Sequence, residues 1–194
     1  EMETLSLTRK PRPVPVTAAQ RPPAPTGRAV DRRRDPQTGS VQGALAAGGA
    51  EIAPDPDDLE FFNGTGGFAD GGREYVTVLR NGQTTPAPWI NVIANPTFGF
   101  QVSAEGSGFV WSENSRENQI TPWSNDPVAD PPGEVIYLRD LDSGAVWTAT
   151  ALPIRGQGTY VARHGFGYSR FDHAAHDISA EMVQFVPLDA PVKV

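Results

Sequence analysis

The sequence has no cysteine among its 194 residues. Disulfide bonds and thiolate metal sites are therefore excluded. No stretch approaches the roughly 18 consecutive apolar residues of a membrane-spanning helix. The first residues also lack the apolar core of a secretory signal. We therefore expect no membrane contact by this segment and a cytoplasmic location.

Aromatic residues are absent from the first 60 positions, and all of the Trp, Tyr and Phe residues lie between Phe61 and Phe185. The early part contains the proline-rich strings KPRPVPV and QRPPAPT and the basic triplet Arg32–Arg34. Such a segment buries too little apolar area to offset its ordering entropy. We expect residues 1–58 to be a largely disordered linker and residues 59–194 to be the folded domain. A spacer is favoured over an SH3-type ligand or a nucleic-acid arm.

Positive charge is scarce outside this linker. Residues 1–50 carry eight Lys and Arg against four acidic residues, a net of +4. Residues 51–194 carry the other eight basic residues against 19 acidic ones, a net of −11. Phosphate backbones require a basic face, so the acidic domain argues against a nucleic-acid partner.

From residue 59 onward the sequence is rich in short runs of β-branched and aromatic residues separated by Gly, Pro, Asn or Asp. This sequence pattern predicts antiparallel strands in an all-β sandwich, with Asp142-Ser143-Gly144 as a hairpin turn. The chain ends on PLDAPVKV as if a further strand should follow, so we expect the sandwich to be truncated. The expected strands are 73–79, 88–94, 98–104, 108–112, 134–140, 145–151, 159–165, 168–174 and 178–187.

The segment 111–134, WSENSRENQITPWSNDPVADPPGE, combines two tryptophans with amides, carboxylates and an arginine. Amides and carboxylates can satisfy sugar hydroxyls, and an indole face can cover the apolar face of a pyranose. The composition therefore fits a sugar subsite. Composition alone fits slightly better a long surface loop whose tryptophans cover the sandwich and whose Asn and Asp residues make turns.

Catalytic and metal sites are not indicated. Glycoside hydrolysis needs two carboxylates across the scissile bond, and Glu117, Asp126, Asp130 and Glu134 are candidates by proximity. The last three, however, lie in ordinary turn dipeptides. The glycine-rich NGTGGF string lacks the helix and lysine of a phosphate loop, and we expect it to form a tight turn. We therefore expect no catalytic residue and no cofactor in this chain.

Histidines are few. The spacing of His173 and His176 would place them on opposite faces of a strand, which disfavours a shared metal ion. We expect no metal site.

Three long strings carry a resemblance to a known family: FFNGTGGFADGGREYVTVL (61–79), TPAPWINVIANPTFGFQVSAEGSGFVWSENSRENQITPWSNDPVADPPGE (85–134) and YVARHGFGYSRFDH (160–173). They resemble the cyclic β-1,2-glucan synthases of bacteria, at the start of their C-terminal glycoside hydrolase family 94 region. Cellobiose and cellodextrin phosphorylases share that family. Phe109 and Phe166 stand where the family pattern has Tyr and Gln, and Gly71-Gly72 departs from the usual Asp-Gly.

The resemblance implies an antiparallel β-supersandwich of the galactose mutarotase type, followed in the parent protein by a helical linker and an (α/α)6 barrel. It implies that the catalytic aspartate lies on the barrel, outside this chain, and that a separate membrane-embedded region anchors the parent in the bacterial inner membrane. It also implies homodimer contacts. The implied ligand is a β-glucan or gluco-oligosaccharide.

The same resemblance implies which residues contact sugar. The candidate substrate-binding residues are Trp111, Asn114, Arg116, Glu117, Asn118, Trp123, Asn125, Asp126, Trp89 and His164. We interpret the chain as a carbohydrate-binding, non-catalytic part of a β-glucan-processing glycosyltransferase or phosphorylase that acts in cyclic β-1,2-glucan synthesis and chain-length control. The alternative is a purely structural sandwich that braces the barrel and forms the dimer contacts. A free-standing glycosidase using Glu117 and Asp126 is the third hypothesis.

Overall fold

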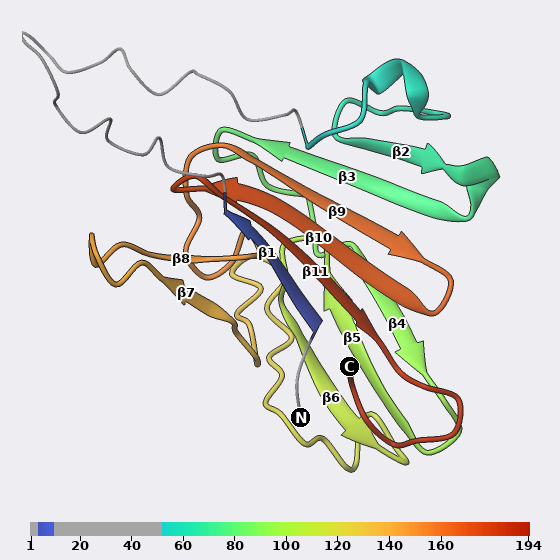
Figure 1. Cartoon of the computed structure of the whole chain (residues 1–194). Helices are drawn as coiled ribbons and strands as arrows, with labels where there is room; N and C mark the ends of the chain where they lie inside the picture. Colours follow the sequence, from blue (N-terminus) through green and yellow to red (C-terminus); the bar gives the residue numbers. More distant parts are fainter. Residues whose placement is uncertain (1–3, 10–51) are drawn as a thin grey trace, which may run out of the picture. The chain divides into compact units, whose positions relative to one another are not determined.

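The computed structural model describes residues 4–9, as a backbone strand, and residues 52–194. Within these residues the secondary structure is all β apart from two short 3-10 turns, Pro56–Asp58 and Asp70–Gly72 (Figure 1). The strands are β1 (Thr4–Arg9), β2 (Gly66–Ala69), β3 (Glu74–Arg80), β4 (Ile90–Ala94), β5 (Phe98–Ser103), β6 (Gly108–Ser112), β7 (Tyr137–Arg139), β8 (Val146–Thr148), β9 (Thr159–Gly165), β10 (Tyr168–Ala175) and β11 (Ile178–Phe185).

The strands form a six-stranded sheet in the order β1-β11-β10-β9-β3-β2, a three-stranded sheet β4-β5-β6 and a hairpin β7-β8. Every strand pairing is antiparallel (Figure 1). The predicted all-β antiparallel sandwich is therefore confirmed, and a strand lies within each of the nine predicted runs or within one residue of its ends. The predicted turn at Asp142-Ser143-Gly144 joins β7 to β8, with Gly144 at a positive φ of 76°.

The core lies between the two larger sheets. Side chains alternate along a strand, so one face of β5 buries Phe100 and Val102. These pack against Phe171 of β10 and Met182 of β11, which come from the inner face of the six-stranded sheet. The hairpin β7-β8 adds a smaller cluster in which Trp147 packs with residues that include Ala180 of β11.

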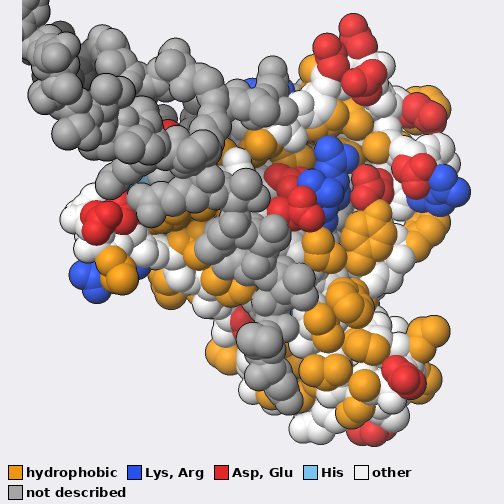
Figure 2. All heavy atoms as spheres, in the orientation of Figure 1, with side chains coloured by type: hydrophobic (Ala, Val, Ile, Leu, Met, Phe, Trp, Pro, Cys, Tyr) orange, Lys and Arg blue, Asp and Glu red, His pale blue; other side chains and the backbone are white. Residues whose placement is uncertain are grey.

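The outer face of the six-stranded sheet has two parts. Val76, Val78 and Val161 are buried there by a cluster that includes Ala53 and Leu59. Over the neighbouring strands β9 to β11, acidic and basic side chains gather at the surface (Figure 2). Ion pairs join Arg163 and Arg170 to Asp172, and Arg170 also to Glu181.

The structure differs in two places from the expectation of a linker over residues 1–58. Thr4–Arg9 forms β1, which pairs with β11 along six residues. Leucine and polar residues alternate in TLSLTR, which is the period of a strand, and this local pattern prevails over the composition of the whole segment. Ile52 and Ala53 pack on the sheet as part of the sandwich. Residues 54–58 are described as well and include the 3-10 turn Pro56–Asp58, whereas the rest of the predicted linker lies outside the described residues.

Candidate functional site

The segment that follows β6 turns back along that strand. Ile120 donates its backbone N–H to Val110 O at 2.8 Å, and Gly133 donates to Gly108 O at 3.2 Å. Trp111 and Gln119 form an isolated β-bridge. These bonds hold residues 112–134 beside the edge of the three-stranded sheet.

Three aromatic rings lie side by side on the outer face of this sheet. The ring centroid of Phe109 is 5.3 Å from that of Trp111 and 5.3 Å from that of Trp123. Because Val110 faces the core, its neighbours Phe109 and Trp111 point outward. Phe109 is 5% exposed and Trp123 is 43% exposed. We refer to Phe109, Trp111 and Trp123 as the aromatic row.

The indole of Trp111 lies directly over Gly99 on the neighbouring strand. A Cβ atom at position 99 would come within 2.6 Å of ring carbon Cζ2 of Trp111. Only glycine permits this close approach, so Gly99 lets the indole lie across the sheet. Beyond it, Ile90 and Val92 of β4 remain 48% and 57% exposed.

Two predicted polar residues shape the loop. Asn114 Oδ1 accepts the backbone N–H groups of Arg116 and Glu117 at 2.9 Å each. Asp126 Oδ1 accepts those of Val128 and Ala129 at 3.0 Å each. Both are turns of the type that Asn and Asp favour, so these oxygens are engaged with the loop's own backbone.

The other predicted residues of the loop lie at its surface. Arg116 and Glu117 form an ion pair of 3.3 Å with side chains 90% and 75% exposed. Asn118 accepts Ser112 N–H through its backbone oxygen at 3.1 Å, and Asn125 is exposed. Arg116, Glu117 and Asn125 therefore have side chains that solvent can reach close to the aromatic row in sequence.

Trp89 and His164 lie elsewhere, within the sandwich. Trp89 packs against the core cluster. His164 Nδ1 is 2.9 Å from Ser169 Oγ, and His164 Nε2 is 3.2 Å from Trp89 O. Burial lowers the pKa of His164 to about 4. The imidazole is thus neutral at pH 7, and because a carbonyl can only accept, the proton is on Nε2 and Ser169 donates to Nδ1.

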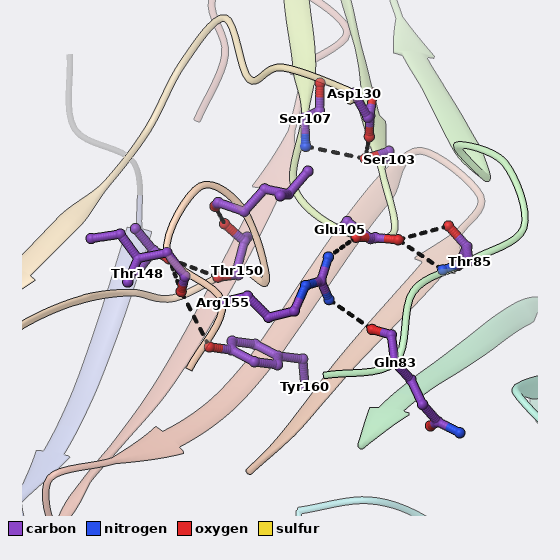
Figure 3. Close-up of polar contacts among 12 residues, drawn as sticks. Gln83, Thr85, Ser103, Glu105, Ser107, Asp130, Thr148, Thr150, Arg155 and Tyr160 are labelled. Atoms are coloured by element: carbon purple, nitrogen blue, oxygen red, sulfur yellow. Dashed lines mark hydrogen bonds and ion pairs between the residues drawn. The ribbon is translucent and has the colours of Figure 1, made fainter. Parts of the chain in front are cut away.

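A second polar cluster joins three loops at one end of the sheets (Figure 3). Glu105 is 7% exposed and accepts Thr85 N–H at 2.7 Å and Thr85 Oγ1 at 3.0 Å. Arg155 forms an ion pair with Glu105 and donates to Gln83 O at 2.7 Å. Glu105 and Arg155 carry no local signal of this pairing, because 50 positions separate them and neither stands in a recognisable motif.

Two further carboxylates of the 111–134 segment are also engaged. Asp130 Oδ2 accepts Ser103 Oγ at 2.7 Å (Figure 3). Glu134 accepts Thr121 Oγ1 at 3.1 Å and pairs with Lys193 Nζ at 2.6 Å.

Metal-ligating residues do not gather in the described part of the chain, where no group of three His, Cys, Asp or Glu side chains could hold a metal ion. His173 stacks on Tyr160 with ring centroids 3.8 Å apart, whereas His176 packs on Trp147 at 4.7 Å. Across residues 4–9 and 52–194, no helix is long and apolar enough to span a membrane.

Comparison with known proteins assigns most of the domain to a described family. Residues 73–194 match the family model described as glycosyl hydrolase 94, supersandwich domain. The chain is 52% identical over 140 residues to a cyclic β-(1,2)-glucan synthase of Rhizobium meliloti (strain 1021), a match that covers 72% of this chain and 5% of that protein. It is 32% identical over 125 residues to an N,N'-diacetylchitobiose phosphorylase of Vibrio proteolyticus, covering 63% of this chain and 15% of the phosphorylase.

A solabiose phosphorylase of Paenibacillus borealis is 28% identical over 134 residues, which is 68% of this chain and 17% of that enzyme. The chain thus spans under a fifth of the length of each of these relatives. The all-β antiparallel fold and the matched family model agree, and the relatives are carbohydrate-processing proteins. The chain therefore belongs to the glycosyl hydrolase 94 supersandwich family.

Proposed function

We propose that this chain is a carbohydrate-binding, non-catalytic part of a β-glucan-processing enzyme and that the glucan binds on the aromatic row. The observation that carries the proposal is the row itself, in which Trp111 and Trp123 flank Phe109 on the outer face of β6. The exposed indole of Trp123 and the partly exposed indole of Trp111 offer a surface on which sugar rings can pack, and the buried Phe109 packs against both.

The physical argument concerns the apolar face and the hydroxyl rim of a pyranose. Its C–H face is apolar and packs on an indole, whereas its hydroxyls need donors and acceptors at the rim. Arg116, Glu117 and Asn125 have exposed side chains in the loop that carries Trp123. They can supply those groups, while Asn114 and Asp126 hold the loop in shape.

This proposal narrows the predicted set of sugar-binding residues. Trp111 and Trp123 are proposed as the stacking residues. Trp89 and His164 act indirectly, because both are packed inside the sandwich and their hydrogen bonds connect β9 to the start of β4.

The wider context is also proposed. The synthase relative is named for cyclic β-(1,2)-glucan, so a β-1,2-linked glucan is the proposed ligand. The parent protein would carry the catalytic aspartate on an (α/α)6 barrel, with this domain in the cytoplasm and the parent anchored in the bacterial inner membrane.

A second function is favoured by a specific observation. The aromatic row continues into exposed aliphatic side chains, with Ile90 48%, Val92 57% and Ile120 57% exposed. Aliphatic side chains on a sheet face suit a protein partner better than a sugar. The alternative is therefore a structural sandwich whose outer face braces the barrel or a second copy of the chain.

Titration with linear and cyclic β-1,2-glucans, followed by tryptophan fluorescence, tests the proposal. We expect saturable quenching, with a Kd that rises about tenfold or more in Trp123→Ala. This rise is equivalent to a loss of about 1.4 kcal/mol of binding free energy. Phe166→Ala is the matched control, because Phe166 is 82% exposed at the turn between β9 and β10.

A flat titration with folded protein would reject sugar binding on the row. Self-association abolished by Val92→Asp, measured by analytical ultracentrifugation, would then support the structural alternative.

A further inference from the structure

A cavity of about 200 Å³ lies between the sheets, away from the aromatic row. Its walls come from the inner faces of β5 and β11 and from the segments around residues 134–136 and 149–150. The cavity faces the interior of the sandwich, whereas the aromatic row is on the opposite face of the three-stranded sheet. Its chemistry is therefore independent of the proposed function.

One wall is polar and held in place by its own contacts. Lys193 Nζ lies 2.6 Å from Glu134 Oε2 and 4.8 Å from the ring centroid of Phe100. Thr121 Oγ1 donates to the other oxygen of Glu134 at 3.1 Å. The side chains of Lys193 and Glu134 are 13% and 28% exposed, so solvent reaches this wall. Gln184 adds an amide.

Apolar side chains form the other part of the lining, and Gln184 Nε2 lies 3.7 Å from Met182 Sδ. Val102 and Met182 are each 3% exposed, and Ile136 packs beside them. A small cavity with one apolar wall and a few fixed polar groups has the character of a small-molecule site.

The size and charge of the cavity restrict the class of ligand that it can bind. The cavity is below the roughly 300–1,000 Å³ of drug-sized ligand sites, so it can take one ring and not an oligosaccharide. Lys193 and Glu134 neutralise each other across 2.6 Å, which favours neither an anion nor a cation. A carboxylate has about four acceptor positions, and Lys193 and Thr121 use two of those of Glu134.

We propose that this cavity is a second sugar subsite that binds a single neutral pyranose, either a free hexose or the terminal unit of a glucan. The hydroxyl groups would bond to Glu134, Lys193 and Gln184, and the C–H face would pack on Met182 and Ile136.

The two methionines of the chain make the test direct. Protein labelled with ¹³C at the methionine methyl groups gives one signal from Met182 in the cavity wall and one from Met2, assigned with Met182→Leu. Titration with methyl β-D-glucopyranoside is expected to shift the Met182 signal saturably. Glucose 1-phosphate and glucosamine are expected to bind at least several-fold more weakly, because each would disturb the neutral pair.

Variants separate this subsite from the aromatic row. Glu134→Gln and Gln184→Leu are each expected to raise the sugar Kd measured from the Met182 signal about tenfold or more. Gln184→Leu leaves the ion pair in place should the first variant fail to fold. Trp123→Ala is the matched control and should leave the Met182 titration unchanged.

A Met182 signal that stays in place up to about 100 mM sugar, where a site with a Kd of about 10 mM would be mostly filled, overturns the proposal. The proposal is also overturned if Trp123→Ala abolishes the shift of the Met182 signal while both cavity variants retain it. Tryptophan quenching by long glucans reports the aromatic row separately, so failure of either site is distinguishable.

Discussion

His164 should make the stability of the domain depend on pH. The imidazole is largely buried, and it connects Trp89 O to Ser169 Oγ. Burial is the main cause that lowers its pKa from 6.5 to about 4, and the hydrogen bond to Trp89 opposes this only in part.

The sign follows from proton uptake. Between pH 6.5 and about 4 the unfolded imidazole binds a proton that the folded one does not. The free energy of unfolding therefore falls as the pH falls through this window, and the contribution is fully present above about pH 6.5. A pKa difference of about 2.5 corresponds to about 3.4 kcal/mol, and partial exposure of the ring reduces this to about 2–3 kcal/mol.

Urea denaturation at pH 7.5 and pH 4.5, followed by circular dichroism, measures the effect. His164→Gln is neutral at every pH, so we expect it to lose about 2 kcal/mol less stability than the wild type between these values. His176→Gln removes one imidazole at an exposed turn position and should change the pH dependence much less than His164→Gln does. The carboxylates and His173, whose pKa is also lowered by burial, are present in all three proteins, and His176→Gln removes the nearby charge that adds to the lowering at His173. Identical losses in wild type and His164→Gln would refute the reasoning.

Two further predictions concern packing and buried charge. Gly99→Val should destabilise the domain by about 1–3 kcal/mol, because a Cβ there meets the Trp111 ring at 2.6 Å. It should also raise the exposure of tryptophan to acrylamide quenching. Unchanged quenching would show that the indole does not lie over Gly99. Glu105→Gln should cost about 3 kcal/mol in urea denaturation, since it leaves Arg155 without its buried carboxylate. Asp70→Asn, in an exposed pair with Arg73, is the control and should change little, so similar losses in both variants would contradict the argument.

Local pattern was enough to predict most of the strands. In REYVTVL and GFVWS, β-branched and aromatic residues alternate with others between turn residues, and these runs became β3 and β6. The Asp142-Ser143-Gly144 turn was predictable for the same reason, because its chemistry is local. β1 was missed, because its partner β11 lies far along the sequence and its own composition merges into a proline-rich stretch.

The candidate site was predictable only in part. Two tryptophans in a polar loop pointed to the 111–134 segment, but the local sequence does not distinguish Phe109 from other strand residues. Pairing of β5 with β6 places Gly99 opposite Trp111, and this register brings the indole over the glycine.

By itself, then, the sequence determined most of the strand positions, the antiparallel all-β class and the family, because these follow from short-range periodicity and from long identical strings. Tertiary structure alone decided which face each side chain occupies. It turned His164 inward and Phe109 outward, paired Glu105 with Arg155, and enclosed a cavity beside Lys193 and Glu134. Those outcomes depend on contacts between residues far apart in sequence, which no local pattern encodes.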